Sequence, residues 1–337
     1  MGDKISIIIP CYNEENTVGS CVENIMGQTI GSDMLELVIV NDASTDNTWK
    51  VLLELERKYP DNVLVIDCEE NGKQGKARNI GVSYSSGNYL MFADADDLMT
   101  PDAVEILYRK MKETGADIVE CEHLDFGDLD RERLAPVLKG DKKVSDIFET
   151  QTVLEEGLYD MEDIWARKDY MRLWGERSCV WGLIINRDFY ESAGLYFPEG
   201  VFMEECFFGE LIMTECRKLY HLSDKLYLYY RNLKNGVTHG ENLKKNYMHK
   251  HFSYALLVVE LKKRGTFSTF VNELAYCYFH NVLLERTYYM KEAFDEFPMA
   301  NYIEMKNYMK STFPDYLSAP FIDEDELDLY RAVFGQV

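Results

Sequence analysis

The sequence has little positive charge, no paired-cysteine motif and no long apolar run. Its 36 basic residues stand against 59 acidic ones, which gives a formal charge of −23. Proteins that bind nucleic acid need a basic surface for the phosphate backbone, so the composition argues against a nucleic-acid partner. The eight cysteines include no C-x-x-C pair. This usage favours reduced thiols in a cytosolic protein over a disulfide framework.

The apolar runs are too short for a membrane protein. None approaches the ~18 consecutive apolar residues of a spanning helix, and the run that begins at Ile5 is too short for a signal peptide. We therefore expect a cytoplasmic protein without a transmembrane segment, and peripheral association with the inner face of the membrane stays open. The 337 residues, 46% of them hydrophobic, can bury a large core. They predict one large domain with an appendage.

The first half of the chain alternates strand and helix patterns. Apolar residues spaced i, i+3, i+4 and i+7, as in Val18, Cys21, Val22 and Ile25, predict helices between short apolar strands. This alternation predicts an α/β fold, a mostly parallel sheet flanked by helices. The predicted strands are 5–10, 35–40, 63–66, 89–93 and 118–121.

The second half has a different character. Residues 125–176 are polar and irregular, and we expect acceptor-facing loops there. Helical patterns over 252–264 and 270–290 predict a C-terminal helical region, whose apolar surface is buried in a bundle or in a homo-oligomer. The predicted domains are residues 1–235 and 236–337.

Three carboxylates follow the fourth predicted strand within four positions. Asp94, Asp96 and Asp97 come directly after a run that should be buried, where like charges repel and desolvation is unfavourable. Either the turn faces water or a cation binds there. Two carboxylates spaced D-x-D can bind Mg²⁺ or Mn²⁺ and leave open positions for phosphates. Because the carboxyl ends of parallel strands meet at one edge, Asp42 and Glu14 should lie in the same crevice.

The segments around these carboxylates carry a family resemblance. They resemble the family 2 glycosyltransferases of the GT-A fold, inverting enzymes that use nucleotide sugars, and the likeness covers roughly Ile5 to Tyr230. The matching segments are 7–15, 38–46, 74–81, 92–97, 181–188 and 197–208.

The resemblance implies a role for each matching residue. The implied nucleotide-sugar contacts are Pro10, Tyr12, Glu14, Asp42, Lys76, Arg78, Asp94 and Asp97, and Asp97 would also support its loop. Asp96 would bind Mn²⁺ or Mg²⁺, with Asp94 and His239 near the same ion. The acidic pair Glu204 and Glu205 matches the motif of the catalytic base, and position matching selects Glu205 where the family usually has Asp. Ordinary explanations compete: Asp42 could cap the following turn, and Lys76 and Arg78 could lie on a solvated helix face.

The resemblance implies transfer of a sugar from a nucleotide diphosphate sugar, with UDP as the leading nucleotide. The implied acceptors are bacterial surface polysaccharide, teichoic acid or glycolipid precursors. Two alternatives stay open. A non-catalytic sugar-nucleotide binder would explain the altered base motif. A sugar nucleotidyltransferase would need a glycine-rich basic loop after the first strand, where this chain has Cys11 to Glu15.

Overall fold

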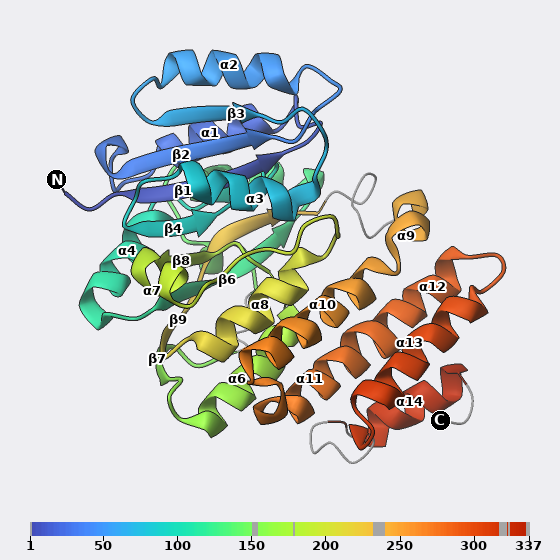
Figure 1. The fold of residues 1–337 in the computed structure, drawn as a ribbon. Helices are drawn as coiled ribbons and strands as arrows, with labels where there is room; N and C mark the ends of the chain where they lie inside the picture. Colours follow the sequence, from blue (N-terminus) through green and yellow to red (C-terminus); the bar gives the residue numbers. More distant parts are fainter. Residues whose placement is uncertain are drawn as a thin grey trace. The chain divides into compact units, whose positions relative to one another are not determined.

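The structure is a computed structural model, and it describes residues 2–149, 154–177, 179–231, 240–316, 322 and 324–334. It divides the chain into two compact units (Figure 1). The first unit contains residues 1–162, 179–200 and 215–232, and the second contains 163–178, 201–214 and 233–337. The last division between the units, at residues 232/233, lies close to the expected boundary at 235, which stays a prediction. Two earlier segments, 163–178 and 201–214, belong to the same unit as the C-terminal helices.

A nine-stranded sheet forms the centre of the first unit. Its strand order is β3-β2-β1-β4-β8-β6-β9-β5, and β7 also pairs with β9. Strands β1 to β4 are mutually parallel, as the sequence predicted, whereas β8, β5 and β7 pair antiparallel with their neighbours. The strands are β1 Ile5–Cys11, β2 Leu35–Asn41, β3 Val63–Asp67, β4 Tyr89–Phe92, β5 Leu98–Met99, β6 Ile118–Phe126, β7 Gly157–Asp160, β8 Leu183–Asn186 and β9 Lys218–Tyr230.

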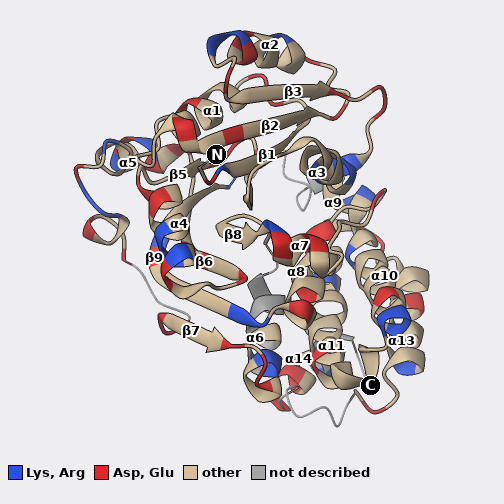
Figure 2. Ribbon diagram, turned by 60° about the vertical axis from the view of Figure 1, so that its left-hand side comes forward, with Lys and Arg blue, Asp and Glu red and all other residues tan. Residues whose placement is uncertain are grey.

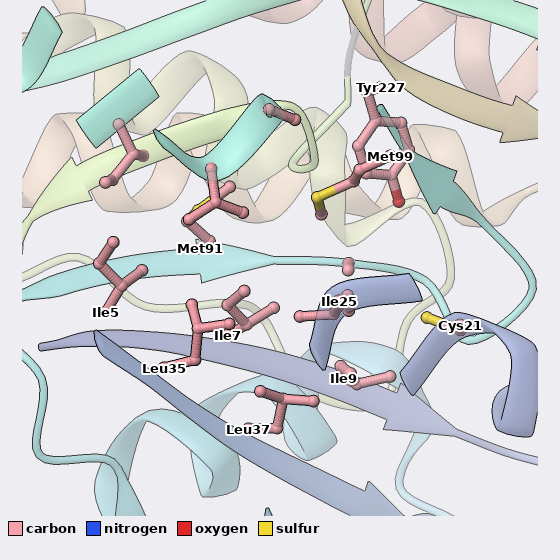
Figure 3. Close-up of a cluster of buried hydrophobic side chains, with 14 of the residues drawn as sticks. Ile5, Ile7, Ile9, Cys21, Ile25, Leu35, Leu37, Met91, Met99 and Tyr227 are labelled. Carbon is pink, nitrogen blue, oxygen red and sulfur yellow. The ribbon is translucent and has the colours of Figure 1, made fainter. Parts of the chain in front are cut away.

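Helices cover both faces of the parallel strands, because the side chains on both faces are apolar. On one face Ile7, Leu37 and Met91 pack with Cys21 and Ile25 of α1 (Figure 3). On the other face α3 approaches β1 closely. A Cβ at Gly81 would lie 2.4 Å from Cγ2 of Ile8, so only glycine permits this approach. The helices of this unit are α1 Val18–Met26, α2 Thr48–Lys58, α3 Lys73–Tyr84, α4 Ala103–Thr114, α5 Arg131–Leu138 and α7 Arg187–Ser192.

The second unit consists mainly of helices, as expected for the C-terminal region. The predicted helix over 270–290 begins as α11 and ends in α12, with a π-helical stretch at Phe279–Arg286 between them. The expected irregular segment 125–176 instead contains α5, β7 and a helix of 14 residues, α6. The helices are α6 Ile164–Arg177, α8 Glu204–Glu215, α9 Gly240–Asn246, α10 His249–Arg264, α11 Val271–Tyr278, α12 Thr287–Ala293, α13 Met299–Thr312 and α14 Glu324–Phe334.

Charged residues lie mostly on the helices and loops (Figure 2), and strands β1, β4, β5 and β8 contain no Lys, Arg, Asp or Glu. Within the described part of the chain, no helix is long and apolar enough to cross a membrane.

Candidate active site

The loops that follow β1 and β2 are bonded to each other. The Asp42 N–H donates to the Cys11 carbonyl at 2.8 Å. The Thr45 N–H donates to Oδ1 of Asn13 at 2.8 Å, and the Asn13 N–H donates to Oγ of Ser44 at 3.0 Å. Asn13 has a φ of 59° in the left-handed region, which asparagine tolerates better than most residues. The carboxyl ends of the two strands therefore lie side by side and are joined by hydrogen bonds into one surface. The sequence predicted that these two strand ends would meet.

Asp42 lies at this surface and is nearly buried, with 3% exposure. Its Oδ1 accepts from the Gly72 N–H at 2.7 Å, and its backbone carbonyl accepts from Nδ2 of Asn71 at 3.1 Å. Asp42 therefore connects the end of β2 to the loop before α3, and it is Oδ1 of Asn41 that accepts from the Ser44 N–H of the following turn, at 3.3 Å. Asn71 was not among the predicted site residues. The sequence signal that could have identified it is its position after the third strand, at the same edge of the sheet.

Arg78 and Asp94 form a largely buried ion pair at the end of β4. Nη2 of Arg78 donates to Oδ1 of Asp94 at 2.9 Å, and the Arg78 side chain is only 3% exposed. The guanidinium also lies over the ring of Phe197, 5.4 Å from its centroid. Arg78 is therefore not on a solvated helix face. Lys76, two residues earlier in α3, is half-buried.

Carboxylates gather on the β4 side of this surface. Burial is the main cause that raises the pKa of Asp96 to about 7, and the charges of Asp94 and Glu14 raise it further. Burial also raises the pKa of Glu14, against a hydrogen bond donated by Thr17 Oγ1 at 2.5 Å. Mutual repulsion between nearby carboxylates is relieved when a cation binds between them. The oxygen donors at Asp94 and Asp96 are the type that Mg²⁺ and Mn²⁺ prefer, so they fit such an ion.

The described residues do not enclose a metal ion by themselves. No group of three or more histidine, cysteine, aspartate or glutamate side chains is arranged to hold a metal in the described ranges. An ion bound by Asp94 and Asp96 would keep open coordination positions for phosphate oxygens and water. This is the usual binding mode of Mg²⁺ at nucleotide sites.

Asp97 points away from this surface into the protein. It is 2% exposed, and its two oxygens accept from the Tyr227 hydroxyl and the Tyr230 N–H, each at 2.7 Å. Burial, followed by the charges of Asp96 and Asp94, raises the pKa of Asp97 well above its ordinary value. These contacts suit the supporting role expected for Asp97, while contact with the nucleotide sugar stays a prediction.

The remaining predicted residues lie at several places. Pro10 is buried in β1 opposite Val40, whereas Tyr12 follows that strand with 46% exposure. Glu204 and Glu205 belong to the second unit, where they are the first two residues of α8 and Glu204 is fully buried. His239 lies outside the described residues.

Comparison with known proteins gives a family match. Residues 6–148 match the family described as Glycosyl transferase family 2. Glycosyltransferase GlyA of Streptococcus pneumoniae is 30% identical over 227 residues, which are 67% of this chain and 30% of the relative. Poly(ribitol-phosphate) beta-glucosyltransferase of Bacillus spizizenii is 36% identical over 116 residues, 34% of this chain and 18% of that protein. The chain thus spans less than a third of the length of these two relatives.

Solved structures share the fold. Residues 1–349 of Staphylococcus aureus TarS, crystallised with UDP-GlcNAc, superpose with a TM-score of 0.70 at 17% identity, covering 98% of this chain and 87% of that one. Mannosyltransferase PcManGT of Pyrobaculum calidifontis, in complex with GDP-Man and Mn²⁺, gives a TM-score of 0.55 at 17% identity, covering 99% and 87%. At this identity the likeness supports the fold alone, which is the expected GT-A type.

Proposed function

The chain belongs to glycosyltransferase family 2, and we propose that it transfers a sugar from a nucleotide diphosphate sugar to an acceptor hydroxyl with inversion. One observation carries the proposal: a nearly buried carboxylate (Asp42), an exposed aromatic ring (Tyr12) and the carboxylates Asp94 and Asp96 follow the ends of β2, β1 and β4, at one edge of the sheet. Sheets of this type bind ligands at that edge.

The nucleotide would bind across the β1 and β2 ends. Because Gly72 bonds to Oδ1 of Asp42, we assign the second oxygen of this carboxylate to N–H and hydroxyl donors of the base or ribose. The exposed ring of Tyr12 is available to stack on the base. Pro10 and Glu14 complete this side of the proposed pocket, and Lys76 and Arg78 are assigned to the diphosphate or the sugar.

The diphosphate would lie toward residues 94–97, the acidic loop that follows β4. Asp96 and Asp94 would hold Mn²⁺ or Mg²⁺, which offsets negative charge on the leaving diphosphate when it is bound. The buried ion pair with Arg78 fixes the orientation of Asp94. Asp96 must lose its proton to bind the ion, and its raised pKa indicates that the protein alone does not favour this charge.

A carboxylate base would complete the reaction. We assign this role to Glu205, next to the buried Glu204, because the pair occupies the motif position of the family's base. The base removes the proton of the acceptor hydroxyl as the oxygen attacks the anomeric carbon from the face opposite the leaving group. Attack from that face inverts the anomeric configuration.

The donor and acceptor classes follow from the relatives. UDP-GlcNAc is bound in a TarS structure, and the names of several relatives refer to teichoic acid or poly(ribitol-phosphate). We propose a UDP-sugar donor and an acceptor from bacterial surface polysaccharide, teichoic acid or glycolipid synthesis. This chemistry would place the protein in the cytoplasm or at the inner face of the membrane.

Thermal shift measurements with UDP-sugars, in the presence and absence of Mn²⁺, test donor binding. A ligand at about a hundred times its dissociation constant stabilises by about 2.7 kcal/mol, which is readily measured. The second measurement is slow donor hydrolysis in Mn²⁺, since a transferase releases UDP and a non-catalytic binder does not. Absence of any nucleotide-sugar binding would contradict the proposal, and binding without hydrolysis or transfer would favour the binder.

A further inference from the structure

Strand β9 holds the acidic loop from inside the protein. The Tyr227 hydroxyl donates to Oδ2 of Asp97 at 2.7 Å and accepts from the Asp94 N–H at 3.2 Å. The Tyr230 N–H donates to Oδ1 of Asp97 at 2.7 Å. Within the loop, the Asp97 N–H donates to the Asp94 carbonyl at 3.2 Å. One phenol therefore contacts both ends of the four-residue turn that carries Asp96.

Tyr227 is itself fixed by a stack of three rings. Its side chain is 1% exposed, and its ring lies parallel to that of Trp181, with centroids 4.5 Å apart and an interplanar angle of 5°. Trp181 also stacks on Tyr229, at 5.2 Å and 18°. Tyr227 and Tyr229 are two positions apart in β9, so their side chains lie on the same face of the strand. Trp181 is stacked with both.

The surroundings leave the Tyr227 ring little freedom. His123 packs edge-on against Trp181 at 4.9 Å. On the core side, Met99 of β5 pairs with Tyr227 in the sheet register, and Figure 3 shows the two side chains next to each other. Closely packed rings resist displacement, so packing fixes the position of the phenol oxygen, and the hydrogen bonds of the hydroxyl act from that position.

We propose that Tyr227 is a positioning residue that orients Asp94 and Asp96 for the cation and the diphosphate, and that the Trp181–Tyr229 stack holds it in place. The inference rests on the proposed function, because it assigns the purpose of the loop to metal and diphosphate binding. Like charges in a turn repel each other, so some fixed contact must keep the carboxylates in register before the cation arrives. A displaced ligand costs affinity, since Mg²⁺ in particular demands near-ideal geometry.

Tyr227→Phe tests the proposal, because it keeps the ring and the stack and removes only the hydroxyl. We expect Mn²⁺-dependent UDP affinity, measured by calorimetry, to fall by about tenfold, because the turn loses both hydrogen bonds of the hydroxyl, the one to Asp97 and the one from the Asp94 N–H. Affinity for uridine, which lacks the diphosphate, should stay unchanged. Trp181→Leu removes the central ring and leaves the hydroxyl, and should weaken Mn²⁺–UDP binding by about threefold.

Tyr254→Phe is the matched control. Tyr254 is a buried tyrosine of the second unit whose hydroxyl accepts from Nδ2 of Asn281 at 3.0 Å. Loss of the Tyr254 hydroxyl should lower thermal stability to a similar extent as Tyr227→Phe and leave Mn²⁺–UDP affinity at the wild-type value. This comparison separates positioning of the acidic loop from a general loss of stability.

The possible outcomes test the role of Tyr227 separately from the proposed function. Wild-type protein that binds UDP equally well with and without Mn²⁺ would overturn the metal site and the inference together. Metal-dependent binding in the wild type, with unchanged affinity in Tyr227→Phe, would overturn the inference alone. Equal losses for UDP and uridine would also overturn it, because they indicate a disturbed fold. If Tyr227→Phe does not fold, the same two affinities in Trp181→Leu decide.

Discussion

His221 of β9 is a buried histidine whose charge should make the stability of the first unit depend on pH. The ring has no exposed surface; its Nδ1 lies 2.6 Å from Oε1 of Glu120 and its Nε2 lies 3.4 Å from Oε1 of Glu122. Lys225 is 3.9 Å from the other oxygen of Glu122. Burial opposes the charged ring, but the hydrogen bonds and charges of the two glutamates outweigh it and raise the pKa of His221 to about 9.

The sign of the effect follows from the two states of the protein. The pKa in the folded state lies about 2.5 pH units above the value of about 6.5 in an unfolded chain. Protonated His221 therefore stabilises the folded state fully below pH 6.5, and this contribution is lost as the pH rises through 9. At about 1.36 kcal/mol per pH unit, the loss amounts to roughly 3 kcal/mol.

His221→Gln removes the titration and serves as the perturbation. Urea unfolding at intervals from pH 6 to 10, under reducing conditions, gives the free energy of unfolding of each protein. We expect the wild type to be more stable than the variant by about 3 kcal/mol at pH 6, with the difference disappearing toward pH 10. Glu120→Gln keeps the shape of the partner and removes its charge, so it should flatten the same pH dependence.

The two units need separate observation, because multi-unit proteins do not always unfold in one step. Trp49 and Trp181 lie in the first unit, whereas Trp165 and Trp174 lie in the second. In a Trp165→Phe, Trp174→Phe background, fluorescence therefore follows the first unit. A difference between wild type and His221→Gln that stays constant from pH 6 to 10 would refute the reasoning, since it would mean that His221 does not titrate there.

Three further predictions concern the proposed active site. Asp96→Ala should abolish Mn²⁺-dependent UDP binding and leave thermal stability unchanged or higher, because it removes a carboxylate whose pKa burial and neighbouring charges already raise. Asp42→Ala should weaken UDP and uridine alike, by ~1–3 kcal/mol in calorimetry, and a loss confined to pyrophosphate would contradict this assignment. Glu205→Gln should slow transfer by ~10²-fold or more at nearly unchanged donor affinity, with a smaller effect from Glu204→Gln; the reverse order would move the base to Glu204.

The sequence predicted the parallel half of the sheet because its signals are local. Each strand from 5 to 93 is a short apolar run, and each intervening helix has its own amphipathic spacing. The parallel topology predicted that the loops at the strand ends would lie close together. In the structure, the hydrogen bond from the Asp42 N–H to the Cys11 carbonyl joins the β1 and β2 ends. The antiparallel strands β7 and β8 could not be placed in the same way, since pairing between distant segments leaves no periodic mark on either one.

The tertiary contacts that hold the site residues in place could not be predicted from the sequence. Tyr227 and Asp97 are 130 positions apart, and in sequence Tyr227 is one aromatic residue in an apolar strand. The Gly72 N–H that binds Asp42 is a backbone group, which any residue but proline would supply. The membership of Glu204 and Glu205 in the second unit likewise depends on tertiary packing.

The question raised by three carboxylates at the end of a buried strand now has a physical answer for each of them. Asp94 has the guanidinium of Arg78 at 2.9 Å, and Asp97 has two hydrogen-bond donors at 2.7 Å. Asp96 lies between them, and its surroundings favour its protonated form through burial and the charges of Asp94 and Glu14. Contacts within the protein thus hold the two flanking carboxyl groups in place, although burial and the neighbouring charges still raise the pKa of Asp97, and the central Asp96 is the group that we assign to an external cation. A turn that only faced water would need neither the buried arginine nor the phenol beneath it, so this division of contacts favours the cation site.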